Sequence, residues 1–199
     1  MRINKYIGLF FVLGFLFACH PIPHDARQVA RDALENARIQ LDSGNKADAL
    51  QLFKDAEYYG LLADDTLTLA YARFNIARCL GEYANEEELF SLLKAADEGF
   101  GDNYTERAKV MTFWGDYYQF HRQFDSAEVY LNRAMDYAER SGSVDAKRCA
   151  LSAFHVKCFN AKEYKKSGDY LQQYFQTYSP DPSDSVLMYY YHNMGNVYY

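Results

Sequence analysis

Apolar residues in the body of the chain recur every three or four positions, which is the spacing of helices with one buried face. The clearest stretch begins at Met111 and continues through Phe124 to Ala134. Only four prolines occur among the 199 residues, and long tracts without proline favour helices. No alternation of apolar and polar residues is long enough to predict a strand. The pattern therefore predicts an all-α protein.

Short polar segments divide the helical tracts. Asn85 stands three residues before Glu88, and Asn103 three residues before Glu106, which is typical of a capped helix start. Turns or helix breaks are expected at residues 42–45, 99–102, 141–142 and 179–183. These signals predict helices of ordinary length joined by short connections.

The helical tracts repeat along the chain at a nearly constant interval. Equivalent positions of successive units are Ala37, Ala77, Gly115, His155 and Gly195. Each position follows the previous one by about 40 residues, a period that is typical of repeat arrays. Self-similarity at such an interval indicates stacked helical hairpins, because each hairpin leaves an apolar face that only the next one covers.

The third unit carries the most complete motif. Its pattern positions hold Met111, Trp114, Gly115, Tyr118, Ala127, Leu131 and Ala134. This set resembles the tetratricopeptide (TPR) repeat, and the other units match it in part. The resemblance implies a TPR-like αα superhelix, a right-handed solenoid of antiparallel helix hairpins. An irregular helical bundle and a HEAT-like array, with its period of about 40–47 residues, are the alternatives.

The repeat pattern sets the expected domain boundaries. We expect a solenoid over residues 25–199, with units at 30–63, 70–103, 108–141 and 148–181 and an incomplete unit at 188–199. The last unit holds a first helix whose apolar face has no second helix to cover it. Since a solenoid needs a polar outer face on its final element, we expect this chain to be the N-terminal piece of a longer protein. The alternatives are that the last helix packs back on the fourth unit or that a partner covers it.

Residues 1–18 have the composition of a signal peptide. Arg2 and Lys5 form a positive start. The eleven residues from Ile7 to Phe17 are all apolar or glycine, and the run is shorter than the roughly 20 residues that span a membrane. The segment therefore indicates export.

The signal ends in Leu16-Phe17-Ala18-Cys19, which resembles the lipobox of bacterial lipoproteins. The resemblance implies cleavage before Cys19 and lipidation of that cysteine, and several acyl chains give a stable membrane anchor. Residues 19–24 would be a tether. The expected location is the bacterial cell envelope, facing the periplasm or the cell surface. The alternatives are an ordinary secretory signal or an uncleaved anchor, with Cys19 incidental in both.

Charge and motif content narrow the function further. The formal net charge of −6 argues against nucleic-acid binding, which needs basic surface. The sequence has no nucleophile elbow, phosphate-binding loop or zinc-protease motif, and its five histidines are scattered. We therefore expect no enzyme activity, no cofactor and no metal site. Cys79, Cys149 and Cys158 are expected to be small buried residues.

A partner of such an array binds the concave surface, which the first helix of each hairpin lines. The residues projected onto that face are Arg31, Leu34, Arg38, Tyr71, Phe74, Arg78, Lys109, Asp116, Gln119, Ser152, Val156, Phe159, Tyr189, His192 and Asn196. Arg38 and Arg78 hold equivalent positions, and a guanidinium pairs well with a carboxylate. These side chains either bind an acidic peptide group or merely solvate the surface and pair with neighbouring acids.

The expected function is a non-catalytic scaffold or sensor that binds a protein or peptide. The chain is similar to TPR lipoproteins of the Bacteroidota, in some of which the repeats precede a transmembrane helix and a cytoplasmic DNA-binding or kinase module. That similarity implies the sensing part of a longer regulator. The alternative is a glycan- or nutrient-uptake accessory lipoprotein of the outer membrane, which needs exposed aromatic platforms, whereas Trp114 occupies an expected core position.

Overall fold

The computed structural model describes residues 25–81, 84–178 and 182–198. The expected signal peptide at residues 1–18, the lipidation site Cys19 and the tether at 19–24 lie outside the described residues. Part of the turn expected at 179–183 lies outside them as well.

All regular elements of the described residues are helices. In chain order they are α2 (Ala26–Asp42), α3 (Lys46–Leu62), α4 (Thr66–Leu80), α5 (Glu86–Gly99), α6 (Tyr104–Phe120), α7 (Phe124–Ser141), α8 (Val144–Asn160), α9 (Tyr164–Gln176) and α10 (Asp184–Tyr198). The prediction of an all-α fold is confirmed.

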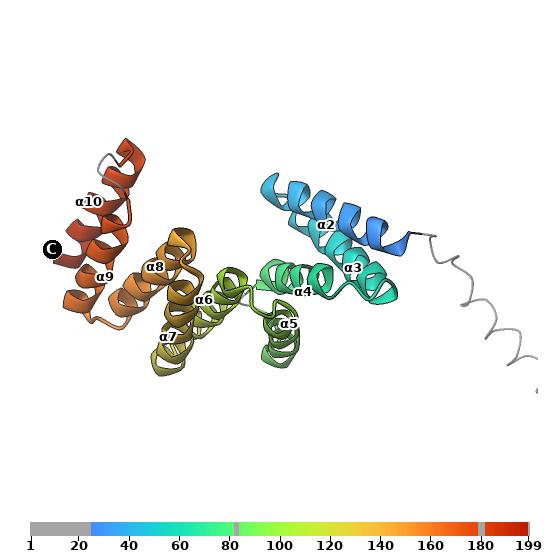
Figure 1. Cartoon of the computed structure of the whole chain (residues 1–199). Coiled ribbons are helices and arrows are strands. Elements are labelled where there is room, and N and C mark those ends of the chain that lie inside the picture. Colours follow the sequence, from blue (N-terminus) through green and yellow to red (C-terminus); the bar gives the residue numbers. More distant parts are fainter. Residues whose placement is uncertain (1–24, 82–83, 179–181, 199) are drawn as a thin grey trace, which may run out of the picture.

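The helices pack in series as hairpins. The pairs α2–α3, α4–α5, α6–α7 and α8–α9 form hairpins, and the second helix of a hairpin contacts the first helix of the next. Figure 1 shows an open arc that runs from α2 to α10, with α5 and α7 on its outer side and α4, α6 and α8 toward its inner side. This arrangement is an αα-solenoid, as the repeat pattern predicted.

The first helix of each hairpin begins at a side-chain cap. Asp25, Asp65, Asn103 and Ser143 each accept a hydrogen bond from the backbone amide three residues later, which satisfies one of the free donors of the first turn. The caps recur at the same intervals as the core positions of the repeat. Each first helix begins four residues before the expected unit, because the core motif starts one turn inside the helix.

Small residues let the two helices of a hairpin approach closely. A Cβ atom on Gly115 would lie 2.3 Å from Leu131 Cδ2, so α6 and α7 leave no room for a side chain there. Ala37 and Ala77 occupy the equivalent positions of the first two hairpins, and both are fully buried. The hairpin core therefore depends on a small residue facing a large one.

In the fourth hairpin the sizes of the two facing residues are reversed. His155 stands at the position of the small residue and is buried, and the facing residue on α9 is the small Ser167. Ser167 Oγ lies 2.9 Å from His155 Nδ1 and donates to the backbone oxygen of His155 at 3.0 Å. These hydrogen bonds satisfy the buried imidazole, so a large polar residue is accommodated at a core position.

Candidate functional site

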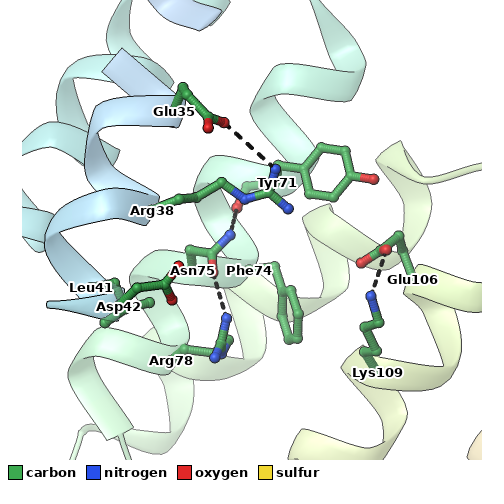
Figure 2. Close-up of a pocket in the computed structure, with 10 residues that line it drawn as sticks. All are labelled: Glu35, Arg38, Leu41, Asp42, Tyr71, Phe74, Asn75, Arg78, Glu106 and Lys109. Carbon is green, nitrogen blue, oxygen red and sulfur yellow. Dashed lines mark hydrogen bonds and ion pairs between the residues drawn. The ribbon is translucent and has the colours of Figure 1, made fainter. Parts of the chain in front are cut away.

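A cavity of about 370 Å³, here called the first cavity, opens between α2, α4 and α6 on the concave side (Figure 2). Helix α2 contributes Glu35, Arg38, Leu41 and Asp42, α4 contributes Tyr71, Phe74, Asn75 and Arg78, and α6 contributes Glu106 and Lys109. Five of the residues projected from the sequence thus come together at one place, namely Arg38, Tyr71, Phe74, Arg78 and Lys109.

The space for this cavity comes from a change in helix spacing. Helix α2 packs on α4 and α6 packs on α8, but α4 and α6 make fewer close backbone contacts. The Phe74 ring stands between them, with ring centroids 6.5 Å from Phe100 and 6.4 Å from Phe113 in edge-to-face geometry. Bulky rings at a helix interface hold the axes apart, which leaves room for the first cavity between α2, α4 and α6.

Asn75 fixes the base of the cavity. It is buried, and its Nδ2 donates to the backbone oxygen of Tyr71 at 2.8 Å. Its Oδ1 accepts from Arg78 at 2.9 Å and so orients that guanidinium (Figure 2). Asn75 was not among the residues projected from the sequence, although its position between Phe74 and Ile76 in an apolar stretch was a usable signal.

The three basic groups of the cavity differ in how fully they are paired. Lys109 lies 2.7 Å from Glu106, a close ion pair. Arg38 lies 4.0 Å from Glu35 with both side chains more than half exposed, so that pair is weak. Arg78 has no carboxylate partner among the described residues. Arg38 and Arg78 are therefore the two cations of the cavity that are available to pair with an acidic ligand.

Aromatic rings lie beside both arginines. The Arg38 guanidinium lies 5.5 Å from the centre of the Tyr71 ring, and that of Arg78 lies 5.9 Å from the Phe74 ring. Burial raises the pKa of Tyr71, and the negative charge of Glu106 raises it further, so its hydroxyl stays protonated. The cavity thus offers two guanidinium groups, a phenol and apolar ring surface.

Arg31 and Leu34 lie outside this cavity. Arg31 lies 3.1 Å from Asp65, whose side chain is 8% exposed, and so ties α2 to the start of α4. Burial opposes ionisation of Asp65, but hydrogen bonds from Thr68 and the charge of Arg31 prevail and lower its pKa. Leu34 is buried in the core between α2 and α3, so its projection onto the concave surface was wrong.

Asp116, Gln119, Ser152 and Val156 line a second cavity of about 680 Å³. It lies between α6, α8 and α9 and includes the exposed Cys149. The expectation of a buried cysteine is therefore wrong for Cys149, although it is confirmed for Cys79 and Cys158.

The remaining projected residues line neither cavity. Phe159 packs against Tyr164, with ring centroids 5.7 Å apart. On α10, the Tyr189 ring lies 5.6 Å from that of Tyr174, and Asn196 Nδ2 lies 3.3 Å from His192 Nε2. These contacts lie on α8, α9 and α10, toward the C-terminal end of the arc and away from α2 and α4 (Figure 1).

The described residues contain no helix that is long and apolar enough to cross a membrane. They also contain no group of three or more histidine, cysteine or acidic residues placed to hold a metal ion.

Fold and cavity together define a class of protein, an αα-solenoid with an arginine- and aromatic-lined concave face. No particular family follows from comparison, because no protein-family model matches the sequence and no curated protein matches it significantly.

Proposed function

We propose that the protein is a non-catalytic scaffold or sensor whose concave face binds an extended protein or peptide segment. The first cavity holds an acidic group of that segment, either a side-chain carboxylate or a C-terminal one. Arg38 and Arg78 pair with this group, and the Tyr71 ring packs against the neighbouring residue of the ligand.

One observation carries this proposal. The first helices of two successive hairpins bring Arg38 and Arg78 to the same cavity of about 370 Å³, and neither guanidinium is engaged in a close ion pair. Arginine is favoured where a planar carboxylate is recognised, because its fork of donors matches both oxygens. Adjacent aromatic rings add apolar contact area, which is typical of binding hot spots.

The proposal also includes the protein's location in the cell and its relation to TPR lipoproteins. We infer a lipid anchor at Cys19 and a position at the cell envelope from the lipobox resemblance, and a relation to TPR lipoproteins from the repeat motif. Burial of Ala127, Leu131 and Ala134, the motif positions of α7, supports the second inference. Substituting Cys19→Ser is expected to move the protein from the membrane to the soluble fraction, and retention in the membrane would contradict the anchor.

The burial of Trp114 favours a peptide over a glycan as the ligand. Its side chain is 3% exposed, with the ring stacked on Tyr118 and tilted against Tyr130. A sugar-binding platform needs an aromatic face open to solvent. The uptake-accessory function therefore remains the second candidate.

A charge-reversal pair tests the function. The purified full chain is applied to an array of immobilised peptides, each present with a C-terminal acid or amide and with Asp or Asn at one internal position. The unaltered protein is expected to bind a subset of acidic peptides about tenfold more tightly than their neutral counterparts, which corresponds to about 1.4 kcal/mol. The double variant R38E/R78E is expected to lose that preference.

The control is K94E/K165E, which makes the same charge change at exposed lysines on α5 and α9 outside both cavities. Thermal unfolding of each variant checks that the array remains folded. Equal binding by R38E/R78E and K94E/K165E would contradict the assignment of the first cavity.

A further inference from the structure

Asp116 and Gln119 lie one turn apart on α6 and present acceptors that no described residue satisfies. Asp116 forms no hydrogen bond or ion pair with any described residue. Gln119 Oε1 is buried and also lacks a donor. Because an unpaired buried acceptor is unfavourable, Gln119 Oε1 favours a ligand that donates a hydrogen bond, and the unpaired Asp116 carboxyl beside it favours a cationic donor.

Lys109, on the same helix as Asp116, and Arg148, which lines the second cavity with it, are already engaged. Lys109, two turns earlier on α6, pairs with Glu106 at 2.7 Å. Arg148 on α8 pairs with Asp145 at 3.1 Å and donates to the side chain and backbone of Thr177 at 2.9 Å each. Neither cation pairs with Asp116, so no described residue compensates the charge of that carboxyl.

Open space adjoins the two acceptors on both sides. Asp116 and Gln119 line the second cavity of about 680 Å³ and also a neighbouring cavity of about 280 Å³. Although Asp116 is accessible to water, the surrounding protein partly desolvates it and raises its pKa to about 6. A cation placed between the cavities would compensate the charge of the ionised carboxylate and donate to Gln119.

We propose that Asp116 and Gln119 form a second subsite, which binds an ammonium or guanidinium group of the ligand whose acidic group lies at Arg38 and Arg78. This inference rests on the proposed function. It specifies that the ligand carries a positive group in addition to its acidic group. Lys109 borders the first cavity, and Asp116 follows it by seven residues, a distance of about 10 Å along the helix. Because Arg38 and Arg78 lie across the first cavity from Lys109 (Figure 2), this distance is a lower limit. At about 3.3 Å per residue, the ligand therefore carries its acid and its base at least about three residues apart.

Synthetic peptides with an acidic residue and a lysine at separations of one to eight residues test the subsite. Each peptide is paired with a counterpart in which the lysine is acetylated, which removes its charge. The unaltered full chain is expected to bind the lysine form about tenfold more tightly at one or more separations of at least about three residues, and to show no preference for lysine at separations of one or two residues. The variant D116N is expected to lose the preference for lysine and to keep the preference for the acid.

The control D169N removes an exposed carboxylate on α9 that lines neither cavity, and it is expected to keep both preferences. Equal binding of lysine and acetyl-lysine peptides, with acid preference retained, overturns the second subsite and leaves the proposed function standing. Loss of lysine preference in D169N as well as D116N also overturns it. Failure to bind any acidic peptide overturns both proposals.

Discussion

Single small or polar residues decide how closely the helices approach and where a ligand has room. Gly115 allows Leu131 to sit against the backbone of α6, and Phe74 does the opposite by holding α4 and α6 apart. The size of Gly115 was visible in the sequence as part of the repeat motif. The sequence did not show that Asp116 is unpaired, because this depends on the ion pairs that Lys109 and Arg148 form with other acids.

Replacing Gly115 with alanine is expected to destabilise the protein by about 1–3 kcal/mol, because the new Cβ atom would overlap a fully buried leucine. Chemical denaturation of the full chain measures the loss. The control is Gly195→Ala on α10, where no heavy atom lies within 4 Å of the added Cβ atom. It is expected to be neutral or slightly stabilising, since alanine favours a helix over glycine. Equal stability of the two variants would show that α6 and α7 are not tightly packed at Gly115.

The raised pKa of Asp116 makes its ionisation unfavourable for folding. The unfolded group ionises near its ordinary value of 3.8 and the folded group near about 6, so stability is lost as the pH rises through this interval. Asp116→Asn removes the charge, and the variant is expected to unfold at a higher temperature than the unaltered protein near neutral pH. Because Asp116 is accessible to water, we expect less than about 1 kcal/mol, or at most about 4 °C.

Melting curves between about pH 4 and about pH 7 measure this effect. The difference between the two proteins is expected to shrink as the pH falls and Asp116 becomes protonated in both the folded and unfolded states. A difference that is constant across the range would show that Asp116 is not perturbed.

At the scale of the helices, the sequence predicted the hairpins because caps, turns and core positions share one period. Asn85 and Asn103 cap α5 and α6 as expected. The sequence could not predict that the small Ser167 makes room for His155. That prediction requires knowing which residue of α9 faces His155 on α8. The link between Arg31 and Asp65 was missed for the same reason, since its partners are 34 residues apart.

Asp65 performs two tasks at the start of α4, as a helix cap and as the partner of Arg31. Asp65→Ala removes both, and we expect a loss of about 1–3 kcal/mol in the free energy of unfolding. Asp65→Asn keeps the capping oxygen and is expected to lose less. D169A serves as the control for removal of an exposed carboxylate. A D65A variant as stable as D169A would show that neither the cap nor the ion pair contributes.

The whole molecule places two chemically different cavities along one concave face. The first offers arginines and aromatic rings, and the second offers an unpaired carboxyl and amide. The sequence predicted that the first helices of the hairpins line the inner side of the arc, and Figure 1 shows α4, α6 and α8 there. It did not predict where the cavities open, since the first one lies where α4 and α6 make few close contacts, and that packing depends on side chains from different helices.

The account depends most on the claim that ligand binds the inner helices of the arc. Hydrogen exchange of the full chain, with and without the tightest-binding acidic peptide from the array, tests this claim directly. Exchange is expected to slow in α4 and α6, which border the first cavity, and to remain unchanged in α5 and α7 on the outer side. Protection confined to α5 and α7, or no protection while the peptide is bound, would contradict the account.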